Sequence, residues 1–423
     1  MPRRAATPAD AGGLVPALPR LLPAGVSPAA TPLYWARGLR AFADGYVSLL
    51  LPVYLKALGF GAFQIGLITA TTLIGSAAAT IIVGFTAHRY GRRSLLVAAT
   101  LLMIGTGIGF VAARQFWPLM IVAFIGTLNP SPSDVSLFLP LEQALLAEAA
   151  SAKARVNAFV LYSLIGSLVG ALGSLAAGLP DLIHGWLGLD AIDALRWMFG
   201  LYALLGLATY HLYRRLPASL DAKPDKPAPP LGPSRNVVFG LAALFSLDAF
   251  GGGLVVQSLL ALWLFERFGL SLTVAGTIFF WSGLASAASF VAAGRLAKRI
   301  GLINTMVFTH FPSNLCLIAM PFAPKLWLVV ALWVVRCALS QMDVPARSSY
   351  VMAVVTPAER AAAASVTAVP RSLVAAVAPA LAGWLLALTP FGWPVLIAGG
   401  LKGIYDVLLL ACFGRRKPPE ESE

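Results

Sequence analysis

Five carboxylates lie within long apolar stretches of this 423-residue chain, in surroundings where ionisable side chains are rare. They are Asp44, Asp134, Glu142, Asp248 and Asp343. A carboxylate held away from water can take up and release a proton near neutral pH, or it can bind a cationic substrate. A structural ion pair or a helix cap is the alternative role for each of them. These acids predict a pathway for protons or a small molecule through an apolar environment.

Asp248 and Asp134 are the favoured sites for a proton or a substrate cation. Asp248 has no basic residue within one turn of its own helix, and it precedes a run of three glycines at 251–253. Asp134 follows the sequence Ser-Pro-Ser, so it is expected to cap the second part of a helix that the prolines break. Asp44 follows Arg40 by four residues, which is the spacing of an ion pair within one helix.

Three arginines occupy similar apolar surroundings near the end of the chain. They are Arg336, Arg347 and Arg371, and each must face a carboxylate or a water-filled cavity. An anionic substrate would bind them, but the five acids outnumber them, and aromatic residues such as Trp263 and Trp281 lie in nearby apolar stretches. An amphipathic or cationic substrate is therefore expected, although such aromatics are more typical of packing than of a binding cage.

Two further polar pairs are expected to serve the structure alone. Lys402 precedes Asp406 by four residues, so the two are expected to pair along one helix. His310 and Asn314 flank Pro312, and they are expected to relieve a kink there. No functional role is expected for either pair.

The composition requires that these residues be held in a membrane. Hydrophobic residues make up 58% of the chain and charged residues 12%, with a mean hydropathy of +0.80, whereas soluble domains carry roughly 25% charged residues. The net charge of +13 is spread between apolar spans and not gathered on one face, which argues against nucleic acid. The three cysteines lack metal-binding spacing, so neither a metal nor a cofactor is expected.

Hydropathy predicts twelve membrane-spanning helices, and therefore an all-α polytopic fold. The predicted spans are 37–58, 63–83, 94–113, 116–147, 157–178, 195–213, 236–264, 272–293, 303–323, 326–354, 361–388 and 392–413. The polar, proline-rich stretch 214–235 is expected to link an N-terminal half, 34–213, to a C-terminal half, 236–413. Residues 1–33 are expected to form a disordered tail, and residues 414–423 a second tail.

The loops carry an uneven distribution of lysine and arginine. Twenty lie in the termini, the linker and the loops on that side, and five lie in the opposite loops. Because positive residues remain in the cytoplasm, both termini and the linker are expected there. A bacterial inner membrane and a monomeric protein are expected.

An internal repeat relates the two halves. Two residues after equivalent prolines, Pro140 and Pro345, stand Glu142 and Arg347. Four glycines of the N-terminal half each have a counterpart 210 residues later, across one span, its loop and the next span. They are Gly59, Gly66, Gly84 and Gly91, with the counterparts Gly269, Gly276, Gly294 and Gly301. Glycines in such places allow close helix approach or a tight loop. Two similar six-helix halves around a central cavity are a known plan for transporters.

The loop GFTAHRYGRR, residues 84–93, resembles the signature G-x-x-x-D-R-x-G-R-R/K of the major facilitator superfamily. It matches at Gly84, Arg89, Gly91, Arg92 and Arg93. The departure is at His88, where that family has an aspartate, so the cytoplasmic latch attributed to that carboxylate is in question. The resemblance covers residues 37–413 and implies the fold of that family. It also implies that helices one, four, seven and ten line the cavity.

These observations predict a secondary active transporter, and no enzyme. It is expected to export small amphipathic molecules by proton antiport, through rocking of the two halves. An uptake symporter is one alternative, and a membrane sensor with a transporter fold is another. No P-loop or soluble catalytic domain is present in this sequence, which argues against an ATP-driven pump. The expected partners are a small-molecule substrate, protons and the lipid bilayer.

Two contacts are predicted at the cytoplasmic side. Glu142 and Arg347 carry opposite charges at equivalent positions, so they are expected to form a gate that joins the halves when that side closes. The competing arrangement pairs Glu142 with Arg371 and Arg347 with Asp343. In the signature loop, Arg92 or Arg93 is expected to bind a helix end or a carboxylate elsewhere, because His88 supplies no local negative partner.

Overall fold

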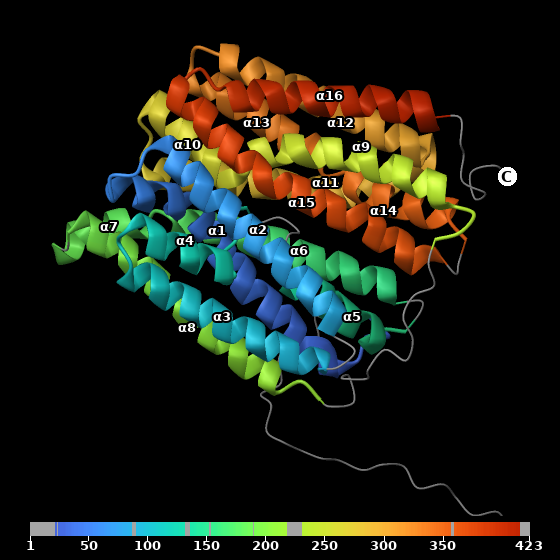
Figure 1. Cartoon of the computed structure of the whole chain (residues 1–423), viewed down its shortest axis with the longest axis horizontal. Helices are drawn as coiled ribbons and strands as arrows, with labels where there is room; N and C mark the ends of the chain where they lie inside the picture. The colour runs from blue at the N-terminus through green and yellow to red at the C-terminus, as the bar shows by residue number, and fades with distance from the viewer. Residues whose placement is uncertain are drawn as a thin grey trace, which may run out of the picture.

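The computed structural model describes residues 22, 24–86, 90–131, 136–151, 154–188, 190–217, 231–356 and 359–414. Figure 1 shows the N-terminal half, blue to green, below the C-terminal half, yellow to red, with the long helices of both halves running in broadly the same direction. The N-terminal half contains α1 (Thr31–Ala57), α2 (Ala62–Thr86), α3 (Arg92–Ala112), α4 (Phe116–Ile125), α5 (Phe138–Ala149), α6 (Arg155–Ala176), α7 (Leu179–Leu187) and α8 (Ala191–Arg214). The C-terminal half contains α9 (Arg235–Leu254), α10 (Gln257–Phe268), α11 (Leu272–Ile300), α12 (Leu302–Ala319), α13 (Leu326–Ser340), α14 (Asp343–Val354), α15 (Arg360–Leu388) and α16 (Trp393–Phe413).

The helices agree with the twelve predicted spans and with the predicted all-α fold. Ten segments of the described chain are long and apolar enough to cross a membrane. The first span, α1, has 27 residues but carries several charges, and the fourth is divided between α4 and α5. The seventh span is divided between α9 and α10, and the tenth between α13 and α14. This chain is a multi-pass membrane protein.

The fourth span breaks where the prolines lie. A proline inside a helix removes a backbone donor and clashes with the preceding turn. Accordingly α4 ends at Ile125 and α5 begins only at Phe138. Opposite this break, the seventh span breaks at Val255 and Val256 between α9 and α10. The two breaks meet, because the backbone N–H of Ser258 donates to the carbonyl oxygen of Pro130 across the halves at 3.1 Å.

Two of the four glycine pairs of the repeat perform the same tasks in both halves. Gly59 and Gly269 lie within two residues of the ends of α1 and α10, and both have a positive φ, +89° and +63°, a conformation that other residues adopt at a cost. Gly66 and Gly276 lie where helices of opposite halves touch. A Cβ on Gly66 would lie 2.6 Å from the carbonyl oxygen of Pro379 on α15, and one on Gly276 would lie 2.5 Å from that of Ser174 on α6. Close packing of α2 on α15, and of α6 on α11, therefore joins the halves.

Polar contacts join the halves in the part of the bundle away from the linker. Gln257 on α10 donates to Ser48 on α1 at 2.9 Å, and Lys56 lies 3.2 Å from Glu266. Thr273 on α11 also donates to Asp181 on α7, at 3.0 Å. The two halves are therefore bonded together at this end.

Exposed tryptophans mark the same end of the bundle. Four tryptophans at this end are each more than half exposed. Three lie near helix starts, Trp117 on α4, Trp197 on α8 and Trp327 on α13, and the fourth, Trp186, lies on the short helix α7. Tryptophan collects where lipid meets water, because its ring is apolar and its N–H is polar. These residues fit a membrane boundary at that level.

Residues 24–33 are structured, so the prediction of a disordered segment over residues 1–33 does not hold for residues 24–33. The backbone N–H of Ser27 donates to the carbonyl of Ala149 at 2.9 Å, and that of Ser151 to Gly25 at 3.0 Å. A short helix, η1 (Pro28–Ala30), then leads into α1, which begins at Thr31. These bonds tie the start of the first span to the end of α5. Residues 1–21 and 415–423 lie outside the described residues.

The end of the linker is held by Glu359, which lies just before α15. Its carboxylate accepts hydrogen bonds from the hydroxyls of Thr356 and Ser234, at 2.6 and 2.7 Å, and from the backbone N–H of Gly232. These bonds lower the pKa of Glu359 from 4.5 to about 2. The contact contributes stability above the ordinary pKa and loses it only as the pH falls toward 2, so it persists throughout the neutral range.

We expect Gly66→Ala to destabilise the contact between α2 and α15. The added Cβ meets backbone atoms of Pro379 and Gly383, which cannot move without shifting a whole helix. Overpacking of this kind costs about 1–3 kcal/mol. The matched control is Gly105→Ala on α3, where a Cβ meets nothing within 4 Å. Thermal unfolding in detergent should show a lower midpoint for Gly66→Ala only, and equal midpoints would contradict the tight contact.

Candidate functional site

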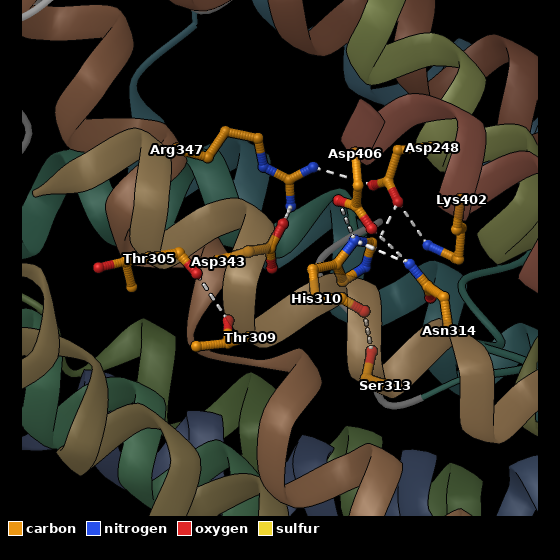
Figure 2. Close-up of polar contacts among 10 residues, drawn as sticks. All are labelled: Asp248, Thr305, Thr309, His310, Ser313, Asn314, Asp343, Arg347, Lys402 and Asp406. Atoms are coloured by element: carbon orange, nitrogen blue, oxygen red, sulfur yellow. Dashed lines mark hydrogen bonds and ion pairs between the residues drawn. The ribbon is translucent and has the colours of Figure 1, made fainter. Parts of the chain in front are cut away.

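Asp248 on α9 is bound by two cations from other helices (Figure 2). Lys402 on α16 donates to its Oδ1 at 2.6 Å, and Arg347 on α14 donates to its Oδ2 at 3.0 Å. The second nitrogen of Arg347 lies 3.4 Å from Asp343, one turn earlier on α14. All of these side chains are at least nine-tenths buried. No basic residue lies within one turn of Asp248 on its own helix, but the assembled helices bring two cations to it.

The run of three glycines makes room for the lysine. A Cβ on Gly251 would lie 3.0 Å from Cγ of Lys402, and one on Gly252 would lie 3.7 Å from its Nζ. Gly253 lies equally close to α15, where its Cβ would meet the carbonyl oxygen of Ala375 at 2.4 Å. The glycines thus let α16 and α15 approach α9, so that the amine reaches Asp248.

A second acid, Asp406 on α16, lies on the other side of this cluster. Its Oδ1 is 2.9 Å from Nδ1 of His310 on α12, and its Oδ2 accepts a hydrogen bond from Asn314 at 2.8 Å. Nε2 of His310 lies 3.7 Å from Asp248. The predicted pair of Lys402 with Asp406 is absent, because Lys402 bonds to Asp248. His310 and Asn314 are therefore part of the polar cluster. The expectation that they only relieve a kink at Pro312 did not predict this role.

The N-terminal half contains its own buried ion pair. Arg40 on α1 binds Glu142 on α5, and Arg40 is also stacked on the ring of Phe138 at 4.2 Å. The hydroxyls of Tyr162 and Tyr213 donate to Glu142 at 2.5 and 2.6 Å. Glu142 has no exposed surface, so these three donors replace the water that a free carboxylate would bind.

The two halves share this design with the charges reversed. In each half, a buried ion pair joins the first span of that half to the second part of its fourth span, which is α1 to α5 in the N-terminal half and α9 to α14 in the C-terminal half. Glu142 is the fifth residue of α5, and Arg347 is the fifth residue of α14, so they are equivalent in structure as well as in sequence. Glu142 binds a cation of α1, whereas Arg347 binds an anion of α9.

The structure does not bring Glu142 and Arg347 together, since each is bound within its own half. The competing arrangement is present in part, because Arg347 contacts Asp343. Its other element, Glu142 with Arg371, is replaced by the bond to Arg40. The gate remains a prediction for a state closed at the linker end.

Asp44 differs from the other acids. It is 8% exposed, yet no hydrogen bond joins its carboxylate to another described residue. The predicted pair with Arg40 is not formed, because Arg40 binds Glu142. Asp44 faces a cavity of about 10 Å³, close to the space of one water molecule. The other residues that line the cavity are Arg40, Met103, Thr127, Ser136, Phe138 and Tyr202.

The remaining predicted pathway residues are less closely joined. Arg371 on α15 lies near enough to Asp248 to add positive potential there. Arg336 is stacked on Trp333 of its own helix at 4.7 Å, and among the described residues no carboxylate binds it. Trp263 is buried and donates to the carbonyl of Pro390, and Trp281 is more than half exposed, so neither belongs to a cage. Asp134 lies outside the described residues.

The signature loop binds within its own half. Arg92 pairs with Glu148 at the end of α5, and Arg93 donates to the carbonyl of Arg214 at the end of α8, at 2.6 Å. One arginine thus reaches a carboxylate and the other a helix end, as the sequence predicts. Gly84 lies in the last turn of α2, which ends at Thr86, and Gly91 is the residue directly before α3. His88 and Arg89 lie outside the described residues.

The sequence matches the model of the Major Facilitator Superfamily over residues 33–340 and 241–423. The chain belongs to this superfamily. It is 25% identical over 417 residues to the uncharacterized membrane protein YJR124C of Saccharomyces cerevisiae, across 90% of this chain and 93% of the yeast protein. Its fold is similar to that of the nucleoside transporter NupG, with a TM-score of 0.70 and 14% identity, across 92% of this chain and 100% of NupG. The human organic anion transporter MFSD10 (TETRAN) has a TM-score of 0.63 and 18% identity, across 90% and 98% of the two chains.

The family establishes this major facilitator protein as a membrane transporter and not an enzyme. It also places the two buried clusters in a fold that moves small molecules between two halves. Sequence reasoning missed His310, Asn314 and Asp406 as members of the C-terminal cluster. The available signal was the recurrence of polar pairs four residues apart in apolar spans, His310 with Asn314 and Lys402 with Asp406.

We expect Glu142→Gln to destabilise the protein by about 3–5 kcal/mol, because it leaves Arg40 buried without an anion. Glu148→Gln on the same helix is the matched control, since that acid is 37% exposed and its surface pair is worth about 1 kcal/mol or less. Chemical denaturation in detergent measures both. The double variant Arg40→Gln, Glu142→Gln should recover part of the loss, and additive losses would contradict the pairing.

Proposed function

We propose that this transporter is a secondary active, proton-coupled antiporter that exports small amphipathic molecules. Asp44 is the observation that carries this proposal. It is a buried acid on the first span, at a polar cavity beside the break in the fourth span, and its carboxylate has no hydrogen-bond partner among the described residues. A proton or a substrate group is therefore able to neutralise this charge without breaking a hydrogen bond to any described residue.

The other acids are less suited to this task in the state observed. Asp248 is bound by Lys402 and Arg347, and Glu142 by Arg40 and two tyrosines. Protonating either carboxylate would leave a buried cation without its partner, at a cost of several kcal/mol. Coupling at Asp44 avoids that cost, so the bound acids hold the helices while Asp44 exchanges its proton.

The excess of lysine and arginine at the linker end supports a cytoplasmic location for the linker and termini. The bonds between Gln257 and Ser48, and between Lys56 and Glu266, then lie toward the outer side. The state described here is closed on that outer side. Rocking of the halves about the contacts of α2 with α15 and α6 with α11 would open it.

The near balance of charge in the spans supports an amphipathic substrate of low net charge. Among the described residues of the helices, the cations of the interior are Arg37, Arg40, Arg336, Arg347, Arg371 and Lys402, and the anions are Asp44, Glu142, Asp248, Asp343 and Asp406. Most of these charges satisfy one another. The excess of acids over bases expected from the sequence disappears when Arg37, Arg40 and Lys402 are counted as well, so a strongly cationic substrate is no longer favoured.

We expect Asp44→Asn to abolish substrate flux driven by a pH gradient while substrate exchange continues. The amide keeps the shape of the side chain but cannot take up a proton. Asp190→Asn, an exposed acid before α8, is the matched control. Both fluxes are measured in proteoliposomes with a panel of labelled amphipathic compounds. Gradient-driven flux that survives in Asp44→Asn would refute the assignment.

The gate between Glu142 and Arg347 is proposed for the state closed on the cytoplasmic side. A double-mutant cycle on transport, with Glu142→Gln and Arg347→Gln, tests it. We expect the combined loss to be smaller than the product of the separate losses, because the second change removes a charge whose partner is already gone. Strictly multiplicative losses would show that the two charges do not meet in the cycle.

A further inference from the structure

We propose that Asp406 and His310 together form a proton-binding site on spans nine and twelve, outside the four spans expected to line the pathway. This goes beyond the role of Asp44, which lies in the other half. The proton is shared between a carboxylate of α16 and an imidazole of α12. Its presence is transmitted to Asp248 and so to the broken seventh span (Figure 2).

The need for a proton follows from the partners of Asp406. Its side chain has no exposed surface, and its hydrogen bonds come from His310 and Asn314. Asparagine is neutral, so the imidazole is the one bonded group able to supply a positive charge. A buried carboxylate without a cation is strongly unfavourable. One proton within the pair removes the problem, either as imidazolium with carboxylate or as neutral imidazole with carboxylic acid.

The surrounding charges leave the pair dependent on its own proton. Lys402, one turn from Asp406, is bound to Asp248. Arg347 on α14 is shared by Asp248 and Asp343, and Arg371 on α15 acts on Asp248. On α13, Arg336 is stacked on Trp333, and on α16 the Tyr405 ring lies 5.9 Å from the His310 ring without carrying a charge.

Both nitrogens of His310 face carboxylates. Nδ1 is 2.9 Å from Asp406, and Nε2 is 3.7 Å from Asp248. A neutral imidazole has one N–H, whereas an imidazolium donates from both nitrogens. The two carboxylates therefore favour an imidazolium, whereas Nδ2 of Asn314, a donor 3.2 Å from Nδ1, favours the form with the proton on Asp406, so the proton is shared between the two side chains. Asn314, one turn along α12, holds the second oxygen of Asp406 and fixes its orientation.

The proton reaches the contact between the halves through Asp248. This carboxylate links α9 to α14 and α16, and α9 ends six residues later at the break before α10. At the start of α10, Gln257 bonds to Ser48 and Ser258 to Pro130 of the opposite half. When the proton is held as imidazolium, its loss weakens the attraction between His310 and Asp248, and so changes how firmly α9 is held.

Nitrogen-15 labelling of histidine tests the site directly, because the chain has four histidines. Spectra of the labelled protein in lipid nanodiscs are recorded across about pH 5 to 9, the range in which histidine titrates. His310 is assigned by its loss in His310→Gln or, should that variant fail to fold, by elimination with Gln variants of His88, His184 and His211. We expect the two His310 signals to change with pH, and Asp406→Asn to alter that change. A His310 ring that stays neutral and unchanged throughout, or is unaffected by Asp406→Asn, would overturn the proposal.

Substrate exchange at equal pH on both sides provides the functional test. We expect the wild-type exchange rate to change by about fivefold or more across the same pH range, the lower end of usual coupling between sites. His310→Gln should flatten that dependence, and His211→Gln, an exposed histidine on α8, should keep it. A pH dependence unchanged in His310→Gln would refute the link to transport. Failure of the Asp44 experiment would remove the antiport coupling alone, because exchange at equal pH involves no proton gradient.

Discussion

The low polarity of the membrane interior is the constraint on which the rest of this structure depends. An unpaired charge there is costly, so every ionisable side chain must find a partner, water or a proton. In this transporter the partners come from other helices. Glu142 joins α5 to α1, α6 and α8, and Asp248 joins α9 to α14 and α16. Buried ion pairs therefore select helix neighbours in surroundings where apolar packing alone distinguishes them poorly.

The two halves meet in a different way from the way each is held together. Within a half, charged and hydrogen-bonded side chains fix the helices. Between the halves, backbone lies against backbone at Gly66 and Gly276, and the hydrogen bonds described lie from the middle of the bundle to one end. Glycine contacts permit a small rotation without breaking a strong bond. A transporter that works by rocking requires two rigid halves and an interface between them along which they can rotate.

The sequence predicted the features that depend on nearby residues. The twelve spans follow from apolar length, and the break before Phe138 follows from prolines. The types of partner that bind Arg92 and Arg93 were also predicted, because a cation near helix ends has few binding partners other than a carboxylate or the carbonyl oxygens of a helix end. The order of residues 24–33 was missed, since the bonds from Gly25 and Ser27 reach a segment more than a hundred residues away.

The partners of Asp248 could not be predicted from its neighbours in sequence. They lie 99 and 154 residues away, and only the assembled helices bring them together. Asp248 has no basic residue within one turn, yet the triple glycine beside it allows Lys402 to approach. The role of His310 in the cluster was not predicted, because a kink at the nearby Pro312 explained its presence in an apolar span. Charge pairing across helices is a tertiary property, so a residue list shows which charges need partners without showing which partners they take.

The steady-state distribution of substrate under an imposed pH difference tests the central claim of proton antiport most directly. The membrane potential of the proteoliposomes is clamped at zero, and the substrate ratio is measured at several pH differences. For one proton exchanged per neutral substrate, the account predicts accumulation on the more acidic side, by about tenfold for each pH unit. Accumulation on the alkaline side would indicate symport, and a ratio that stays at one would indicate passive transport. Either result would contradict the account.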